Sequence, residues 1–269
     1  MISQPEDSLN LDHFPNYVYP SGPHTTVFIY HAEFGINGAH QDFANRNVEW
    51  VYTGLAKAQG SDTEDEASDA QGHSTCTASK AVGSIYGAAK DATLVVVKAP
   101  NLYEDSISEL LGTIIDHILA NGREGKSVVT ISWNAEERYS HFAYIRTRWW
   151  HIMVANLEAL YRMDVPVFCS AGNEASGNQR TQSDTIPAAF ASTHIILNNN
   201  PIIPVSNCDS KGARWPSSQV AELPIFAPGV EIECAGMGKR GRQVETGTSF
   251  CKSLPQITKV ADRVSITNA

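Results

Sequence analysis

Short apolar, β-branched runs alternate along this chain with segments of helical period, and that order limits the fold more than any other feature. The four clearest runs are residues 27–30, 92–98, 127–132 and 165–170. Continuous apolar runs of this length are typical of strands buried on both faces of a parallel sheet. Helical segments at about 106–121 and 141–163 separate the later runs, which requires right-handed crossovers. The sequence therefore predicts an α/β fold built on a mostly parallel central sheet.

The helix predicted at 106–121 has the clearest periodicity. One face carries seven apolar residues at helical spacing: Ile107, Leu110, Leu111, Ile114, Ile115, Ile118 and Leu119. Ser106 and Glu109 form a capping-box pattern at its start, and Asn121-Gly122 is a stop signal at its end. In the stretch 141–163 the residues expected to face inward are Ile145, Trp149, Ile152, Leu157 and Leu160. Both helices are therefore expected to cover the sheet with an apolar face.

Length, composition and charge restrict the class of protein. A chain of 269 residues, 42% hydrophobic, is large enough for one sizeable domain. Its net charge of −9 and the lack of a basic stripe argue against nucleic acid or an anionic membrane as a partner. No apolar run approaches the roughly 18 residues of a membrane span. The first residues do not resemble a signal peptide, which fits a cytosolic protein or a chain without its natural N-terminus.

The five cysteines show neither CxxC pairs nor a Cys/His spacing typical of zinc sites. An odd number leaves at least one free thiol, and a core of this size permits disulfides without requiring them. The acidic segment 60–69 is interpreted as a solvated surface loop. A cation site is the alternative, although no ligand geometry is apparent there. We therefore expect no metal site.

Two segments contain residue types suited to nucleophilic catalysis. His73 stands before the small-residue run 77–83, which predicts a buried helix, and an imidazole at its start is suited to general-base chemistry. Ser249 follows Gly-Thr near a predicted helix start, and an adjacent base would activate its hydroxyl. The alternatives are a structural or surface histidine and an N-cap serine.

Two further segments follow predicted strands. Asn173 lies just after the run 165–170, where its side-chain amide is suited to donate to an oxyanion; a simple turn is the alternative. Glu33 follows the first run and offers a carboxylate that could orient an imidazole. In open α/β sheets, ligands bind beyond the carboxyl ends of the strands. These positions therefore belong where a site is expected.

These segments, taken in order, resemble the signatures of the subtilisin family of serine peptidases. Gly72-His73-Ser74-Thr75 is similar to the family's G-H-G-T-H, and Ser170-Ala171-Gly172-Asn173 to its Ala-Gly-Asn. Gly247-Thr248-Ser249 is similar to its Gly-Thr-Ser, and Glu33-Phe34-Gly35 stands where the family has Asp-Thr-Gly. The order of acid, His, Asn and Ser is also the family's. The resemblance implies a subtilisin-like sheet with helices on both faces.

The resemblance also implies how the chain is divided. It covers residues 27–250 and includes stretches at 86–92 and 227–230 that are similar to parts of the family outside the site. Residues 1–269 are accordingly expected to form a single peptidase domain. Within it, residues 1–26 are an N-terminal extension and residues 251–269 a divergent, truncated or altered C-terminus.

A serine endopeptidase that acts on proteins or peptides in extended conformation is the function that the resemblance implies. Ser249 would attack the scissile carbonyl, His73 would transfer the proton, and Glu33 would be the acid. Asn173 would stabilise the oxyanion with the Ser249 amide. The residues expected to bind the substrate, partly by strand pairing, are Ser132, Trp133, Asn134, Ser170, Ala171 and Gly172. The resemblance further implies a monomer, an extracellular location and no required cofactor, with structural Ca²⁺ possible at unidentified ligands.

Departures from the family pattern keep an alternative open. Glu33 is one methylene longer than Asp, whereas catalytic geometry tolerates about 0.5 Å of misplacement. Ser74 and Asn134 each replace a family Gly, and the segment after Ser249 lacks the family's spacing to its Pro and long helix. The alternative is a catalytically impaired protein of the same fold that binds peptides or proteins. An unrelated nucleotide-dependent enzyme is disfavoured, because no Gly-x-Gly-x-x-Gly or Walker pattern follows a strand.

Overall fold

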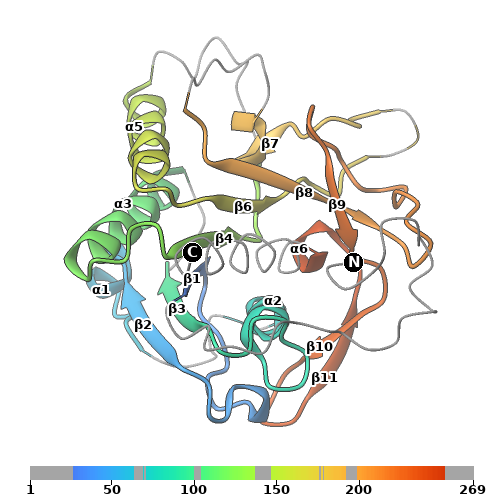
Figure 1. Ribbon diagram of the computed structural model, residues 1–269, viewed down its shortest axis with the longest axis horizontal. Helices are drawn as coiled ribbons and strands as arrows, with labels where there is room; N and C mark the ends of the chain where they lie inside the picture. Colours follow the sequence, from blue (N-terminus) through green and yellow to red (C-terminus); the bar gives the residue numbers. More distant parts are fainter. Residues whose placement is uncertain are drawn as a thin grey trace, which may run out of the picture.

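The central element is a seven-stranded parallel sheet. The structure is a computed structural model that describes residues 27–63, 69, 71–99, 104–136, 147–175, 177, 179–191 and 199–251, with the backbone alone at 104, 105, 135 and 136. The strands are β1 (Phe28–Glu33), β2 (Val48–Tyr52), β3 (Thr93–Lys98), β4 (Ser127–Ile131), β6 (Val167–Ser170), β8 (Ile202–Cys208) and β9 (Ile225–Pro228). Their order is β2-β3-β1-β4-β6-β8-β9, and each neighbouring pair is parallel. The predicted α/β fold is therefore confirmed (Figure 1).

Helices cover both faces of the sheet because side chains alternate along each strand. Tyr30 and Ala32 of β1 belong to an apolar cluster that includes residues of α3 (Glu104–Ala120) and α5 (Arg148–Arg162). Ile29 belongs to a second cluster, which includes residues of α2 (His73–Val82). Figure 1 shows α3 beside α5, with α2 apart from both. The alternation therefore turns His31 and Glu33, like Ile29, toward the face covered by α2.

Two pairs of short antiparallel strands accompany the sheet. One is a hairpin of β10 (Ile232–Ala235) and β11 (Arg242–Glu245), and the other joins β5 (Ala135–Glu136) to β7 (Thr185–Ile186). The remaining helices are short: α1 (Gly54–Ala58), α6 (Thr248–Cys251), η2 (Gln41–Phe43) and η3 (Ala188–Ala191). A disulfide between Cys76 and Cys234, which the sequence left open, joins α2 to β10. The other three cysteines are buried and lie outside this disulfide: Cys169, Cys208 and Cys251.

Some predicted details of the helices are wrong. α3 begins at Glu104, so Ser106 lies inside the helix and is not its cap. Leu119, expected on the apolar face that covers the sheet, is 52% exposed near the end of α3. In α5 the buried residues are Trp149, Met153, Leu157 and Leu160, and Ile152 lies at the edge of this stripe with 39% of its surface exposed.

The ends of the chain and one predicted segment lie outside the described residues. Residues 1–26 and 252–269, the expected extension and most of the divergent C-terminus, are among them, as is 141–146 with Ile145. In the described part, α5 begins at Arg148, where the Thr147 hydroxyl accepts a hydrogen bond from the Trp150 amide. Among the described helices, none combines the length and the hydropathy that a membrane span needs.

Candidate functional site

The ends of three neighbouring strands and the first turns of two helices supply the predicted site residues. Glu33 is the last residue of β1, Ser132 follows β4, and β6 leads into Ala171, Gly172 and Asn173. His73 is the first residue of α2, and Ser249 lies in the first turn of α6. Because parallel strands end at one edge of the sheet, residues distant in the sequence reach the same region.

The carboxylate of Glu33 is fully buried and joined to two other segments. Its Oε1 accepts a hydrogen bond from the Ser132 amide at 3.0 Å, and its Oε2 accepts one from the Ser74 hydroxyl at 3.4 Å. Burying a carboxylate without such donors costs several kcal/mol. Glu33 is therefore held between the end of β4 and the first turn of α2.

A buried aspartate, Asp69, holds the first turn of α2. Its Oδ1 accepts a hydrogen bond from the Ser74 amide at 2.9 Å. Its Oδ2 accepts from both the amide and the hydroxyl of Thr75, at 2.8 and 2.5 Å. Burial raises the pKa of Asp69, while the donors from Thr75 and Ser74 and the charge of His73 act to lower it. Asp69 thus satisfies amide groups that the start of a helix leaves without partners.

This role of Asp69 corrects one interpretation of the sequence. The acidic segment 60–69 was expected to be a solvated loop, yet Asp69 is only 4% exposed. The solvated interpretation is therefore wrong for this residue, because its carboxylate satisfies helix amides. The only sign of this role in the sequence is that Asp69 stands four residues before His73, and the acidic residues just before it made Asp69 look like part of a surface loop.

The His73 ring lies beside the helix that carries Ser249. Gly72, which precedes it, has a φ of +69°, and a Cβ there would lie 2.8 Å from the Gln243 Oε1 atom. The imidazole is half-buried and meets the Phe250 ring edge-on, with centroids 5.3 Å apart. Within the described part of the chain the imidazole makes no hydrogen bond, either to Glu33 or to Ser249. The structure brings His73 to the site without a hydrogen-bonded triad.

The hydroxyl of Ser249 is directed at the end of β4. It donates to the Ser132 carbonyl at 2.7 Å, and the residue is 7% exposed. The amide of Ser132 donates to Glu33, so the backbone of one residue contacts both the acid and the serine. Ser132 therefore links two of the three residues expected to form a triad.

Asn173 is exposed and its amide has a fixed orientation. Its Oδ1 accepts from the Thr248 amide at 2.9 Å and from the Thr248 hydroxyl at 3.2 Å. With the oxygen engaged, Nδ2 is the end of the side chain that is available to donate. Among the described residues this nitrogen has no acceptor. The arrangement is suited to an oxyanion next to the Ser249 turn.

In the segment 132–134, the side chains of Trp133 and Asn134 contact the protein itself. Trp133 is 7% exposed, belongs to the apolar cluster under α3 and α5, and donates its indole N–H to the Ala32 carbonyl at 2.8 Å. With its amide oriented as its neighbours require, Asn134 lies within 3.1–3.2 Å of the Ser170 hydroxyl. The side chains of Trp133 and Asn134 are thus engaged with the protein.

The segment 170–172 lies beside Ser132 at the end of the parallel strands. Ser170 is buried, and its hydroxyl donates to the Ser132 carbonyl at 3.4 Å. Ala171 is also buried, and its amide donates to the Val205 carbonyl of β8. Gly172 has a φ of +108° and its amide donates to the Thr248 hydroxyl at 3.3 Å. The predicted substrate residues from β4 and β6 therefore lie together.

Sequence reasoning missed the connections that Ser74 makes. Ser74 has the helical backbone of α2 and a negative φ, so a side chain fits at this position without backbone strain. Its carbonyl accepts from the Nε2 of His31 at 3.1 Å, and His31 is 1% exposed on β1. Since a carbonyl only accepts, Nε2 carries the proton. The period-2 pattern of β1 was the only sequence signal for His31.

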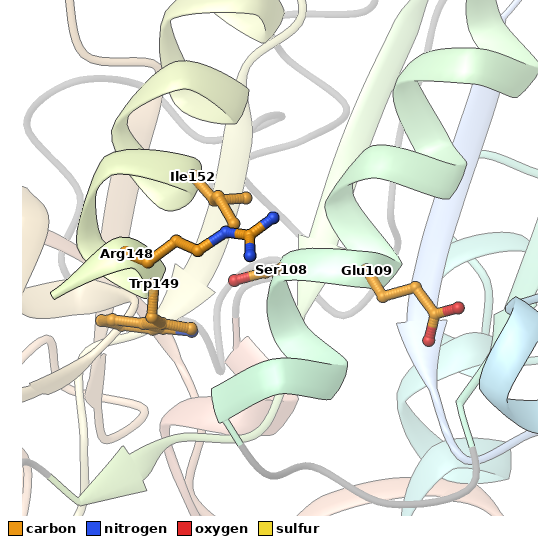
Figure 2. Close-up of a pocket in the computed structure, with 5 residues that line it drawn as sticks. All are labelled: Ser108, Glu109, Arg148, Trp149 and Ile152. Atoms are coloured by element: carbon orange, nitrogen blue, oxygen red, sulfur yellow. The ribbon is translucent and has the colours of Figure 1, made fainter.

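A cavity also lies away from these residues, between α3 and α5. It measures about 420 Å³ and is lined by Ser108, Glu109, Arg148, Trp149 and Ile152. Figure 2 shows Arg148 and Trp149 opposite Ser108, whereas the Glu109 carboxylate points away. Glu109 accepts a hydrogen bond from the Leu55 amide at 3.0 Å. The described lining includes none of the predicted site residues. The described residues also contain no cluster of three or more His, Cys, Asp or Glu that could hold a metal ion.

Comparisons with known proteins identify what the chain is similar to. Residues 27–261 match the sequence profile of the Subtilase family. A subtilisin-like serine protease of Penicillium rubens, Pen ch 13, is 30% identical over 239 residues, covering 87% of this chain and 52% of that protein. A subtilisin-like protease of Coccidioides posadasii is 29% identical over 223 residues, covering 81% and 48%. The chain spans about half the length of these curated relatives.

Solved structures agree on the fold. The crystal structure of a cold-adapted subtilisin-like serine proteinase has a TM-score of 0.67 at 18% identity, covering 97% of this chain and 85% of that one. The S218A mutant of the PatA protease domain has a TM-score of 0.66 at 16% identity, covering 90% and 82%. At such identities the likeness concerns the arrangement of the backbone. It confirms the subtilisin-like fold expected from the sequence.

Proposed function

Because this chain belongs to the subtilase family, we propose that it is a serine endopeptidase. Ser249 is the nucleophile, His73 the general base and Glu33 the acid that orients the base. Asn173 Nδ2 and the Ser249 amide bind the oxyanion. The substrate is a protein or peptide, which pairs in extended conformation with the backbone of 132–134 and 170–172.

The observation that carries this proposal is the double contact at Ser132. Its amide donates to Glu33 and its carbonyl accepts from Ser249, so the acid and the serine both contact the backbone of one residue. The His73 ring lies against Phe250, the neighbour of Ser249. Three residue types suited to acyl transfer thus lie near one edge of the sheet, next to the Asn173 amide nitrogen, which has no acceptor among the described residues.

A change in one hydrogen bond would make the Ser249 hydroxyl available to the base. In the free protein the Ser249 hydroxyl donates to the Ser132 carbonyl. An extended peptide that pairs with this segment brings a backbone N–H that competes for the same carbonyl. Displacement of the hydroxyl would free it to donate to the His73 ring. Catalytic hydrogen bonds are often loose in free enzymes and tighten when substrate binds.

The test is hydrolysis of a fluorogenic peptide by the native chain and by three variants. Ser249→Ala and His73→Ala are each expected to abolish turnover, since each removes a member of the triad. Ser210→Ala, which changes an exposed serine after β8, is the matched control and should retain the native rate. Turnover that survives Ser249→Ala would overturn the proposal.

The second candidate is a peptide-binding protein of the same fold that does not cleave. It is favoured by the absence of any hydrogen bond to the His73 imidazole within the described residues, and by the longer acid, Glu33. A native chain that binds an extended peptide without cleaving it would support this candidate. Peptide binding is measured by fluorescence anisotropy in parallel with hydrolysis.

The remaining aspects of the function are proposed from the family resemblance. The reaction needs no cofactor, because proton transfer and oxyanion binding are supplied by side chains and backbone. Any structural Ca²⁺ has ligands that neither the sequence nor the described residues identify. We place the protein outside the cell, as a monomer that contacts only its protein or peptide substrate. Its charge of −9 disfavours nucleic acid and anionic membranes as partners.

A further inference from the structure

Two of the positions at which the chain departs from the family pattern contact each other. Glu33 stands where the family has Asp, and Ser74 stands where it has Gly. In the structure the Ser74 hydroxyl donates to Oε2 of Glu33 at 3.4 Å, with both residues fully buried. A glycine at this position would offer no side-chain donor. The two departures are therefore parts of one contact and not two separate defects.

Every polar group of Ser74 is engaged by a different residue. Its amide donates to Asp69 at 2.9 Å, and its carbonyl accepts from His31 at 3.1 Å. Its hydroxyl reaches Glu33. His31 and Glu33 are two residues apart on β1 and turn to the same face, so Ser74 joins the first turn of α2 to this strand at two points.

The length of the acid explains why this contact matters. Glu33 extends one methylene further than Asp, and its carboxylate needs a partner at the more distant position, because a buried charge is costly without donors. Ser132 supplies the donor for Oε1, and Ser74 supplies one for Oε2. Ser74 also follows His73 directly in α2. The donor that fixes the acid is thus part of the same helical turn as the candidate base.

We infer that Ser74 is a positioning residue that holds the Glu33 carboxylate in register with the first turn of α2, so that the serine compensates for the longer acid. The inference rests on the proposed function for its catalytic consequence. The contact itself does not depend on that function. Ser74 acts through Glu33 and touches no substrate.

A double-mutant cycle tests this inference. Ser74→Ala is made in the native chain and in a Glu33→Asp background, and kcat and KM are measured for a fluorogenic peptide. In the native chain the loss of kcat should be about tenfold, as expected for one hydrogen bond to a charged group. KM should stay nearly constant, since Ser74 is not part of the substrate segments. In the Glu33→Asp background the same change should alter kcat by less than about twofold.

Two further variants separate positioning from folding. Ser74→Cys keeps an atom at the γ position, slightly larger than the oxygen, and offers only a weak S–H donor, so an intermediate loss of kcat is expected even if Ser74→Ala folds poorly. Ser79→Ala is the matched control. Ser79 is a buried serine of the same helix, and its hydroxyl contacts the Cys76 carbonyl and the Ala235 amide instead of an acid. Ser79→Ala should lower the free energy of unfolding and leave kcat unchanged relative to the parent chain in each of the two backgrounds.

The outcomes distinguish this inference from the proposed function. Equal losses of kcat in both backgrounds would overturn the inference, because Ser74 would then act on the helix alone. If the native chain hydrolyses no peptide, the proposed function fails, and the same cycle is analysed from free energies of unfolding. Coupling between Ser74→Ala and Glu33→Asp would then support the contact. Strictly additive effects would overturn it.

Discussion

The hydroxyl of Ser249 donates to the carbonyl of Ser132 at 2.7 Å, which ties the serine of α6 to the peptide unit that follows β4. The amide of the same residue donates to Glu33. The backbone of Ser132 thus contacts both the acid and the serine, and neither contact uses the Ser132 side chain. The Ser132 carbonyl is therefore the partner of Ser249 in the free chain, and in the proposed function it is also the partner of a substrate amide.

Replacing Asp69 should weaken the start of α2. Asp69→Ala removes a buried acceptor from the Ser74 and Thr75 amides, so we expect a loss of about 2–4 kcal/mol in the free energy of unfolding. Turnover should fall with it, because His73 opens the same helix. Urea unfolding measures the effect.

Asp69→Asn is the matched control for this prediction, because it retains one oxygen that can accept from a helix amide. It should lose less stability than Asp69→Ala. An unchanged midpoint for the alanine variant would contradict the role assigned to Asp69.

Removing the disulfide should destabilise the contact between α2 and the β10–β11 hairpin. The bond between Cys76 and Cys234 closes a loop with a sequence separation of 158 residues, and losing such a crosslink typically costs about 2–5 kcal/mol. The double variant Cys76→Ala, Cys234→Ala should therefore unfold at lower urea, and reductant should reproduce the effect in the native chain.

A cysteine outside the crosslink supplies a control for the disulfide. Cys208→Ala removes a buried cysteine that forms no disulfide, so its response to reductant should match that of the native chain. Native stability that is the same with and without reductant would contradict the predicted role of the crosslink.

The amide of Asn173 should contribute to rate and not to substrate affinity. Asn173→Ala removes the Nδ2 donor, and kcat should fall by about 10²–10³, a magnitude taken from subtilisin itself. KM should change little, because the oxyanion forms only during the reaction. Steady-state kinetics on a fluorogenic peptide measure both constants. A rise in KM at unchanged kcat would show that Asn173 binds substrate instead.

Asp184 should make stability depend on acid pH. Burial acts to raise the pKa of Asp184, but hydrogen bonds from Arg180 and Gln219 and the Arg180 charge outweigh it, so the pKa lies below its usual value. An Asp whose pKa is lower in the folded state than in the unfolded state stabilises the fold at every pH above its unfolded-state pKa. This contribution disappears as the pH falls through the folded-state pKa.

The variant Asp184→Asn tests this linkage. It should be less stable than the native chain at neutral pH by no more than about 1 kcal/mol, because the ion pair is partly exposed. The difference should vanish on acidification. Urea titrations at several pH values measure it, and a gap that stays constant down to strongly acidic pH would contradict the assignment.

The sequence predicts the fold well where local pattern and burial agree. The runs at 92–98 and 127–132 became strands of a parallel sheet, because continuous apolar runs suit burial on both faces. The start of α3 was misplaced, since the pattern of Ser106 and Glu109 occurs inside helices as well as at their ends. Strand β2 was missed because all its residues are only half-buried, which weakens its pattern.

For the candidate site too, some features follow from local sequence and others only from the folded chain. Motif order selected Glu33, His73, Asn173 and Ser249 as candidates, and their roles stay predictions. The contact of Ser74 with Glu33 depends on the distance between β1 and α2, which no local pattern encodes. The burial of Asp69 and the pairing of Cys76 with Cys234 are likewise long-range outcomes of packing. Ser249 was expected to hydrogen-bond His73, but its hydroxyl donates to the Ser132 carbonyl instead, an acceptor that no motif indicates.

The central claim is that His73 activates Ser249, and the rate of fluorophosphonate labelling tests it most directly. Labelling is followed over time in the native chain and in His73→Gln, with the modified residue located by mass spectrometry. The account predicts a single adduct on Ser249 in the native chain and a loss of at least about 10³ in rate without the imidazole. Equal labelling rates for the two proteins, or an adduct on another serine, would contradict it.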